Sequence, residues 1–210
     1  MKKFLFIILF TCCVNVVFAQ FAFGISGSYN TSLGFDENWK INSKNLLYGS
    51  KQGHGFALGL FMRGGNWVFV QPEVTYNLMI SNAIVGDEGK YYKIIHNTLN
   101  VPILLGVKAV NTKKFNMRFM VGPRFNFALG TKTPDFFEDY AIDAVPRKWL
   151  LGLEAGLGFD IGRVTIDFRY NLSQDIFNYV AKNEQIKLNR SPVNAFSVGL
   201  GYKFVDKRRR

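Results

Sequence analysis

Strict alternation of apolar and polar residues constrains this fold more than any other feature of the sequence. In residues 163–174, RVTIDFRYNLSQ, apolar side chains from Val164 to Leu172 alternate with polar or charged ones. A β-strand sends successive side chains to opposite faces, so this segment has one apolar and one ionic face. Eight such segments predict eight strands in a single all-β domain. They lie at residues 21–31, 54–63, 66–79, 95–110, 114–129, 147–160, 163–174 and 194–204.

The connections between these segments alternate in length. Three tight turns are predicted, at residues 63–66, 111–114 and 160–163. The other four connections are predicted as long polar loops, at residues 32–53, 80–94, 130–146 and 174–193. This pattern is typical of an antiparallel up-and-down outer-membrane barrel, whose short turns face the periplasm. An even number of strands then places both termini on the periplasmic side.

The apolar face of each segment is predicted to contact lipid acyl chains. A soluble eight-stranded barrel of the lipocalin type would also alternate, but its apolar face would turn inward. The segments have 10 to 16 residues, whereas a soluble strand averages about five or six and a tilted membrane strand needs about 9 to 11. Aromatic residues also gather near the segment ends, as at the two interfaces of a membrane barrel.

The opposite face carries charged residues and many glycines, and we predict that it lines the lumen. An eight-stranded barrel is just wide enough inside for its side chains. Buried charges need partners there, so they are expected to pair across the lumen. The predicted lumen charge network consists of Glu73, Lys108, Arg118, Arg124, Glu154, Asp167 and Arg169.

Three prolines interrupt the alternating segments. Pro72, Pro102 and Pro123 lack the N–H that a strand ladder uses, and a closed barrel has no edge strand to accommodate them. Each is therefore predicted to mark a β-bulge or a strand end.

Residues 1–19 have the features of a cleaved secretory signal peptide. A basic start, MKK, precedes an apolar stretch that is too short to span a membrane, and small residues precede a cut between Ala19 and Gln20. An alternative is a lipoprotein modified at Cys12, because residues 9–12 have the form L-x-x-C. Both cysteines, Cys12 and Cys13, lie inside the signal, so the mature chain is predicted to have no thiol chemistry and no disulfide.

The mature chain is predicted to be strongly basic. Without Lys2 and Lys3, 24 of the 26 Lys and Arg residues remain against 15 Asp and Glu, a formal charge of about +9. Nucleic acid is a common partner of basic chains, but no nucleic-acid-binding motif is present and none is expected for an exported protein. Phosphates of outer-membrane lipids and lipopolysaccharide are nearer partners, and the alternative is that the charge only keeps the loops soluble.

Several stretches of the sequence resemble the PorT-like outer-membrane β-barrel family. They are the AQ at the predicted cleavage site, LNVPILLGVK (99–108), FMVGPRFNFALG (119–130), GLEAGLGFDIG (152–162) and SVGLGYKF (197–204). The resemblance implies an eight-stranded barrel over residues 20–205, in the outer membrane of a Gram-negative bacterium. The namesake of the family is associated with secretion across the outer membrane by the type IX system, which makes secretion-system components candidate partners.

The last strand is predicted to carry the signal that the outer-membrane barrel-assembly machinery reads. Barrels of this kind usually end on an aromatic residue, and Tyr202 and Phe204 are the candidates. Here VDKRRR follows Phe204, and residues 206–210 are predicted to form a basic periplasmic tail.

The sequence contains no recognisable catalytic, cofactor or metal motif. His54 and His96 lack the spacing and the neighbouring carboxylates of a metal site. The predicted third loop contains clustered carboxylates that could hold calcium, although their spacing matches no known calcium loop. They are Asp135, Glu138, Asp139 and Asp143.

The sequence as a whole favours a small closed barrel of structural or interaction type, without enzymatic activity. It would act through its extracellular loops or as an accessory of an envelope or secretion machine. The alternatives are a narrow pore or small-ligand carrier, and a membrane-embedded enzyme that modifies lipids or cuts peptides, for which the sequence shows no Ser, His and Asp set.

Overall fold

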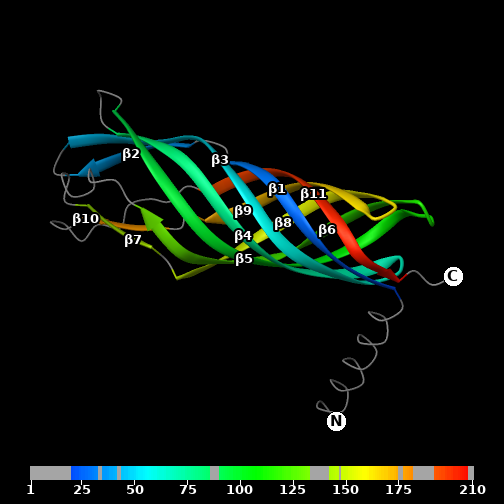
Figure 1. Cartoon of the computed structure of the whole chain (residues 1–210). Helices are drawn as coiled ribbons and strands as arrows, with labels where there is room; N and C mark the ends of the chain where they lie inside the picture. Colours follow the sequence, from blue (N-terminus) through cyan, green and yellow to red (C-terminus); the bar gives the residue numbers. More distant parts are fainter. Residues whose placement is uncertain are drawn as a thin grey trace, which may run out of the picture.

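The computed structural model shows a closed barrel of antiparallel strands (Figure 1). It describes residues 20–32, 35–41, 44–85, 90–132, 142–146, 148–174, 177–181 and 192–207. The predicted signal peptide, the end of the predicted tail and the carboxylates at 135–139 lie outside these residues. The wall consists of β1 (Phe21–Ser32), β3 (Lys44–Gly65), β4 (Val68–Val85), β5 (Lys90–Asn111), β6 (Phe115–Lys132), β8 (Trp149–Ile161), β9 (Val164–Gln174) and β11 (Pro192–Lys207).

Pairing between the first and last strands closes the wall. In β1, Ile25 lies opposite Leu60 of β3 on one side and opposite Tyr202 of β11 on the other. The remaining wall strands pair in chain order. A closed ring leaves no strand edge within the wall, which is what hydrocarbon requires of a spanning sheet. The predicted eight-stranded antiparallel barrel is thus confirmed.

Three shorter strands lie within the connections that were predicted as long loops. Strand β2 (Phe35–Ile41) pairs with the first residues of β3, so that Ile41 faces Lys44. Strands β7 (Ile142–Pro146) and β10 (Phe177–Ala181) form a separate two-stranded sheet.

Strands β3, β4 and β5 are longer than predicted. The prediction placed loops at 32–53 and 80–94, but β3 already begins at Lys44, β4 continues to Val85 and β5 begins at Lys90. Ladder pairs such as Tyr48 with Val85 hold these extensions. The prediction was wrong here because ladder hydrogen bonds join backbone groups and do not require apolar alternation.

The three tight turns lie where the sequence predicts them. They leave only residues 66–67, 112–114 and 162–163 between strands. Gly65 and Gly162 have φ angles of 124° and 59°, which glycine adopts without the strain that a Cβ would cause. All three turns lie at the end of the barrel where β1 begins and β11 ends, called the turn end below (Figure 1).

The prolines do not interrupt the barrel, contrary to the prediction that each marks a bulge or a strand end. Pro72 faces Ile103 and Thr75 faces Asn100, so the offset between β4 and β5 is the same on both sides of the proline. Pro102 and Pro123 likewise lie inside continuous pairings of β5 with β6 and of β6 with β8. A proline removes one ladder donor, but its fixed φ is compatible with an extended chain and adds no extra residue.

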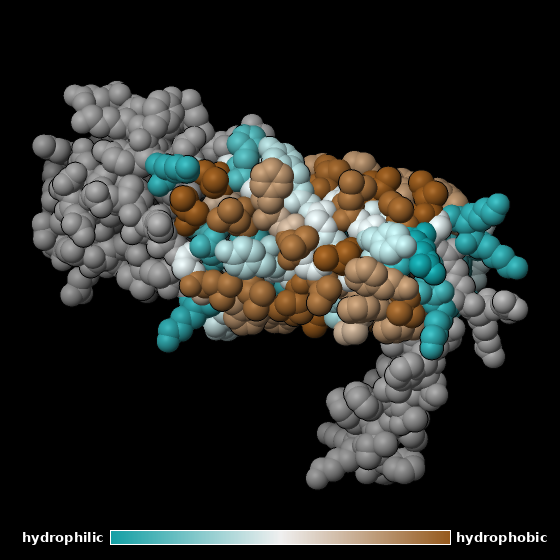
Figure 2. Space-filling model, in the orientation of Figure 1, coloured by the Kyte–Doolittle hydropathy of each residue, from teal (hydrophilic) through white to brown (hydrophobic). Residues whose placement is uncertain are grey.

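Apolar side chains face outward over the whole wall. Phe56 is 67% exposed and Leu200 is 61% exposed, and every described residue of the predicted apolar face is exposed or half-buried. Figure 2 shows apolar residues over most of the visible wall and strongly hydrophilic ones near its two ends. Within the residues that the structure describes, no helix is long and apolar enough to cross a membrane.

The interior is mostly polar, and its apolar part is small. A cluster of Phe69, Leu104 and Met120 packs on one side of the lumen. Most of the other fully buried side chains are polar or charged, including Arg118, Glu154 and Asp160. This distribution is the reverse of a soluble barrel, whose apolar side chains fill the inside.

Candidate functional site

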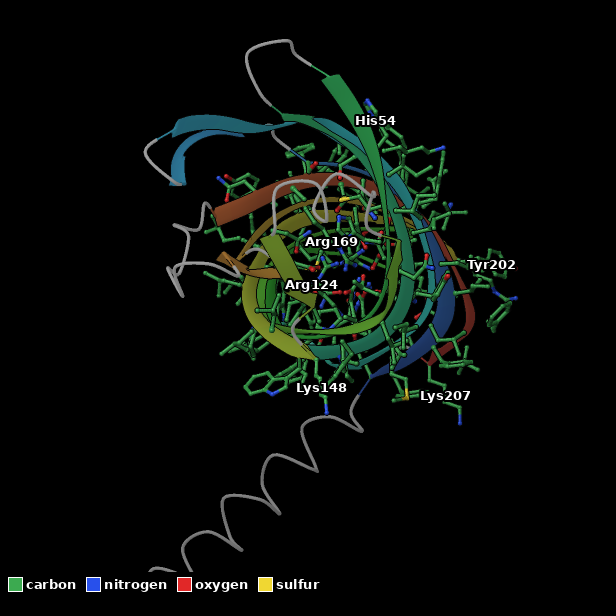
Figure 3. All side chains as sticks on the ribbon, turned by 90° about the vertical axis from the view of Figure 1, so that its left-hand side faces the viewer. His54, Arg124, Lys148, Arg169, Tyr202 and Lys207 are labelled. Atoms are coloured by element: carbon green, nitrogen blue, oxygen red, sulfur yellow. The ribbon has the colours of Figure 1, made fainter. Side chains whose placement is uncertain are left out.

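The seven residues of the predicted charge network all lie inside the barrel. Glu73 comes from β4, Lys108 from β5, Arg118 and Arg124 from β6, Glu154 from β8, and Asp167 and Arg169 from β9. Five of them are buried, and Arg124 and Arg169 are half-buried. Figure 3 shows Arg124 and Arg169 inside the ring of strands, while the labelled His54 and Tyr202 lie outside it.

Arg169 connects three carboxylates from three strands. Its Nη2 lies 2.7 Å from Glu73 Oε1 and 2.8 Å from Asp167 Oδ2, and its Nη1 lies 2.9 Å from Glu154 Oε1. Glu154 also accepts from Arg124, whose Nη1 lies 2.9 Å from Oε2. Charge-assisted contacts of this length are the strong kind, because both partners are ionised and largely removed from water.

A second cluster surrounds Arg118, which has no exposed surface. Its Nη2 lies 2.6 Å from Asp167 Oδ1 and 3.1 Å from Asp160 Oδ1, and it also donates to the Thr165 hydroxyl. Asp160 accepts in turn from Arg63 at 2.7 Å. Since Asp167 contacts both Arg118 and Arg169, the two clusters form one continuous network.

Two of these ion pairs cross the full width of the lumen. In the closed ring, β4 and β9 are four strands apart in either direction, and so are β3 and β8. The pairs Arg169–Glu73 and Arg63–Asp160 therefore link opposite walls. They act as cross-braces, whose ends cannot separate without leaving buried charges unpaired.

Sequence reasoning missed several residues of this network. Arg63 and Asp160 were predicted as the last residues of two strand segments and the first residues of two tight turns, and neither was placed in the charge network, although both are buried in the lumen. Gln71 accepts from Arg63 and Lys203 lies 3.7 Å from Asp160, and neither was singled out. Continuing the alternation by one or two residues into the turns would have found Arg63 and Asp160.

Four arginines and four carboxylates form the centre of the network, which continues through Lys203 to Asp206. The arginines are Arg63, Arg118, Arg124 and Arg169, and the carboxylates are Glu73, Glu154, Asp160 and Asp167. Lys108 lies nearer the turn end, where its Nζ donates to Gln20 Oε1 at 3.1 Å and to the Gly65 carbonyl at 3.5 Å. The formal charges of the eight-residue set cancel, which lowers the cost of burying them.

Two small cavities lined by described residues lie in the lumen, on either side of Arg118. The first is about 40 Å³, and its lining includes Arg124, Glu154 and Arg169. The second is about 20 Å³, lies at the turn end, and is lined partly by Arg63 and Asp160. One water needs roughly 10–15 Å³ of such volume. These two cavities therefore have room for only a few waters. Arg118 lies between them, because it pairs with Asp167 in the lining of the first cavity and with Asp160 in the lining of the second.

The two aromatic residues of the predicted assembly signal lie on the outer surface of β11. The rings of Tyr202 and Phe204 are 5.8 Å apart, and Phe204 is 6.2 Å from the ring of Phe23 on β1. The strand continues past them to Lys207, which pairs with Phe21. The predicted tail at 206–210 therefore begins too early, because β1 offers ladder partners as far as Lys207.

The histidines lie apart from each other and from the lumen network. His54 is exposed on the outer surface, where its Nδ1 is hydrogen-bonded to the Tyr29 hydroxyl and the two rings stack at 5.9 Å. His96 is half-buried on β5. Among the residues that the structure describes, no group of three or more His, Cys, Asp or Glu side chains could hold a metal ion. Asp143 belongs to β7, but its side chain is not among those described.

Known proteins similar to this chain are outer-membrane barrels. The family model for the outer membrane protein beta-barrel domain matches residues 15–175. The crystal structure of the outer membrane protein OprG from Pseudomonas aeruginosa matches with a TM-score of 0.61 and 12% identity, over 89% of this chain and 96% of that one. Ail, the attachment invasion locus protein of Yersinia pestis, solved with the heparin analogue sucrose octasulfate, matches with a TM-score of 0.42 and 15% identity, over 88% and 99%. No curated protein matches the sequence.

Proposed function

Because this chain belongs to the outer membrane protein β-barrel family, we propose that it is a closed, non-catalytic barrel that presents its loop end to partners in the cell envelope. The observation that carries this proposal is the filled lumen. Arg118 has no exposed surface and is paired with carboxylates from two strands. A lumen that holds only a few waters leaves the two ends and the outer surface as the places where partners can bind.

The length of the strands beyond the apolar band supports a role in presenting the loops to partners. Strands β3 and β5 have 22 residues each, about twice the 9 to 11 that a tilted strand needs to cross the bilayer. Their extensions lie at the end opposite the tight turns, called the loop end below, where β2 adds a further strand to β3 (Figure 1). In this proposal, the raised wall holds the loops away from the membrane surface.

The lumen carboxylates support a role without catalysis. A general acid or base must be able to exchange its proton with a substrate. Glu73, Glu154 and Asp167 each contact at least one arginine within 3 Å. Their role in this proposal is to neutralise the arginines and brace the wall.

We propose that the turn end and both termini face the periplasm, and that the loop end faces outward, where lipopolysaccharide lies. This orientation follows the usual arrangement of short and long connections in such barrels. Tyr202 and Phe204 would then be read by the barrel-assembly machinery from the periplasmic side. The resemblance to the PorT-like family makes an accessory role in a secretion machine the most specific form of the proposal.

Crosslinking in the native membrane tests where the partners bind. Photoreactive residues would replace Lys148 at the loop end and Lys113 at the turn end, which are both exposed. We expect protein adducts from the Lys148 position, and secretion components among them would support the accessory role. Protein adducts from neither position, or from the Lys113 position alone, would contradict the proposed display at the loop end.

A further inference from the structure

All exposed formal charges on the described part of the barrel are positive. Among the side chains that the structure describes, every carboxylate is buried except Asp206, which is half-buried and lies 3.0 Å from Lys203. The described charged side chains that are exposed are Lys93, Lys113, Lys114, Lys148, Arg163 and Lys207. Four of the five described carboxylates lie in the lumen, so the described part of the outer surface carries mainly cations.

Four of these six cations lie at the turn end, and they come from different parts of the wall. Lys113 and Lys114 belong to the β5–β6 turn, Arg163 to the β8–β9 turn, and Lys207 to the end of β11. We call these four residues the basic collar. The β3–β4 turn contributes the exposed Trp67 at the same end. The collar therefore extends over the part of the ring from β5 to β11, and Figure 2 shows hydrophilic side chains projecting at this end.

The collar directly adjoins the apolar band. Phe115 follows Lys114 in the sequence, and Ile161 and Val164 flank the turn that contains Arg163; all three are exposed. Arg163 is hydrogen-bonded to Tyr202, which raises the pKa of its guanidinium. Aromatic rings mark the head-group level of membrane barrels, so this contact places the guanidinium at the depth of lipid phosphates.

We propose that the basic collar binds the phosphate groups of anionic phospholipids in the leaflet that surrounds the turn end. Lysine and arginine side chains donate charge-assisted hydrogen bonds to phosphate oxygens. The direct border between these cations and the exposed apolar residues Phe115, Ile161 and Val164 favours lipid over a protein partner, because lipid phosphates lie at the edge of the hydrocarbon layer. With the orientation proposed above, this is the inner leaflet of the outer membrane, but binding itself does not depend on that orientation.

The three tryptophans of the chain, Trp39, Trp67 and Trp149, allow a direct test. Replacing Trp39 and Trp149 by phenylalanine leaves Trp67, beside the collar, as the only indole fluorophore. The mature chain is reconstituted in vesicles of equal amounts of phosphatidylcholine and phosphatidylglycerol, with bromine atoms on the acyl chains of one lipid or the other. Bromine quenches tryptophan at short range, so the ratio of the two quenching efficiencies reports which lipid lies next to Trp67.

We expect brominated phosphatidylglycerol to quench Trp67 at least about twofold more strongly, and this preference to fall with added salt. The variant K113Q/K114Q/R163Q/K207Q should bring the ratio to unity. The variant K113Q/K114Q, at the turn that is hydrogen-bonded to the turn of Trp67, should lower it in part and serves if the fourfold variant does not assemble. The matched control K93Q/K148Q, which removes the two described exposed cations outside the collar, should leave the ratio unchanged.

Equal quenching by the two brominated lipids in the chain with its intact collar would overturn the proposal. An unchanged preference in the collar variants, or its loss in K93Q/K148Q, would also overturn it. Heat-dependent mobility in detergent gels shows that each variant has folded as a barrel before its fluorescence is compared.

Discussion

Arg169 of β9 and Glu73 of β4 form an ion pair of 2.7 Å across the lumen, although they are 96 residues apart in the sequence. The strands that carry them face each other across the closed ring. The pair therefore fixes the distance between opposite walls. Arg169 also pairs with Glu154 of β8 and Asp167 of β9, so the brace includes these two residues. The ionic lumen thus contributes to the shape of the barrel, besides its proposed role in closing it.

Removing the arginine from this pair should strongly destabilise the barrel. Arg169→Met leaves three carboxylates next to one another, and we expect unfolding in urea from lipid vesicles to require about 3–5 kcal/mol less. Arg169→Lys retains the charge and should lose less. As the matched control, Lys148→Met at an exposed position should change stability by less than about 0.5 kcal/mol. A loss below about 1 kcal/mol for Arg169→Met would contradict the role of the pair as a brace.

Gly158 tests whether Arg118 is held rigidly. A Cβ at this position would lie 2.5 Å from Arg118 Cζ and 2.6 Å from Asp167 Oδ1. Because Asp160 and Asp167 fix the guanidinium, Gly158→Ala should cost about 1–3 kcal/mol of unfolding free energy. At Gly130 a Cβ would meet nothing within 4 Å, so Gly130→Ala is the control and should be nearly neutral. Equal stability of the two variants would show that Arg118 moves freely.

A charge on the outer surface tests the contact with lipid. Val121 is 49% exposed and lies midway between the aromatic residues Phe115 and Phe127 of β6. Val121→Arg should cost about 2–4 kcal/mol in a bilayer, whereas Trp67→Arg near the interface should cost about 0–1 kcal/mol. Urea titrations of both variants in the same vesicles give the comparison. Similar costs at the two positions would place the apolar band elsewhere.

Cysteine labelling on intact cells tests the orientation. The predicted mature chain has no cysteine, so Lys148→Cys and Lys113→Cys each introduce a single thiol, at opposite ends of the barrel. We expect a membrane-impermeant maleimide to label Lys148→Cys on intact cells, and Lys113→Cys only after the outer membrane is permeabilised. The reverse pattern would show that the turn end faces outward.

The architecture was predictable because the period-2 alternation determines which side of the wall each residue faces. Residues from Val164 to Leu172 alternate so regularly that the same register holds from one end of β9 to the other. The three tight turns were predictable for a related reason, since they lie between uninterrupted alternating segments. Closure then follows from the need of every backbone group in hydrocarbon to find a partner.

The partners within the lumen were not predictable. Alternation shows that Glu73 and Arg169 point inward, but not at which height each lies or which residue it faces across the barrel. Those relations depend on strand tilt and stagger, which are properties of the closed ring. Arg63 and Asp160 were missed for a simpler reason, because they directly border the turn residues and were counted with them.

Single-channel recording in planar bilayers tests the central claim, that the ionic network closes the lumen, most directly. The purified mature barrel should give no steady conductance steps, because Arg118 is fully buried between the two described cavities and paired with Asp160 and Asp167. The same preparation of Arg118→Ala, which removes the side chain between the cavities, should give measurable steps or a raised ion leak. Steady steps from the unmodified barrel would contradict the account.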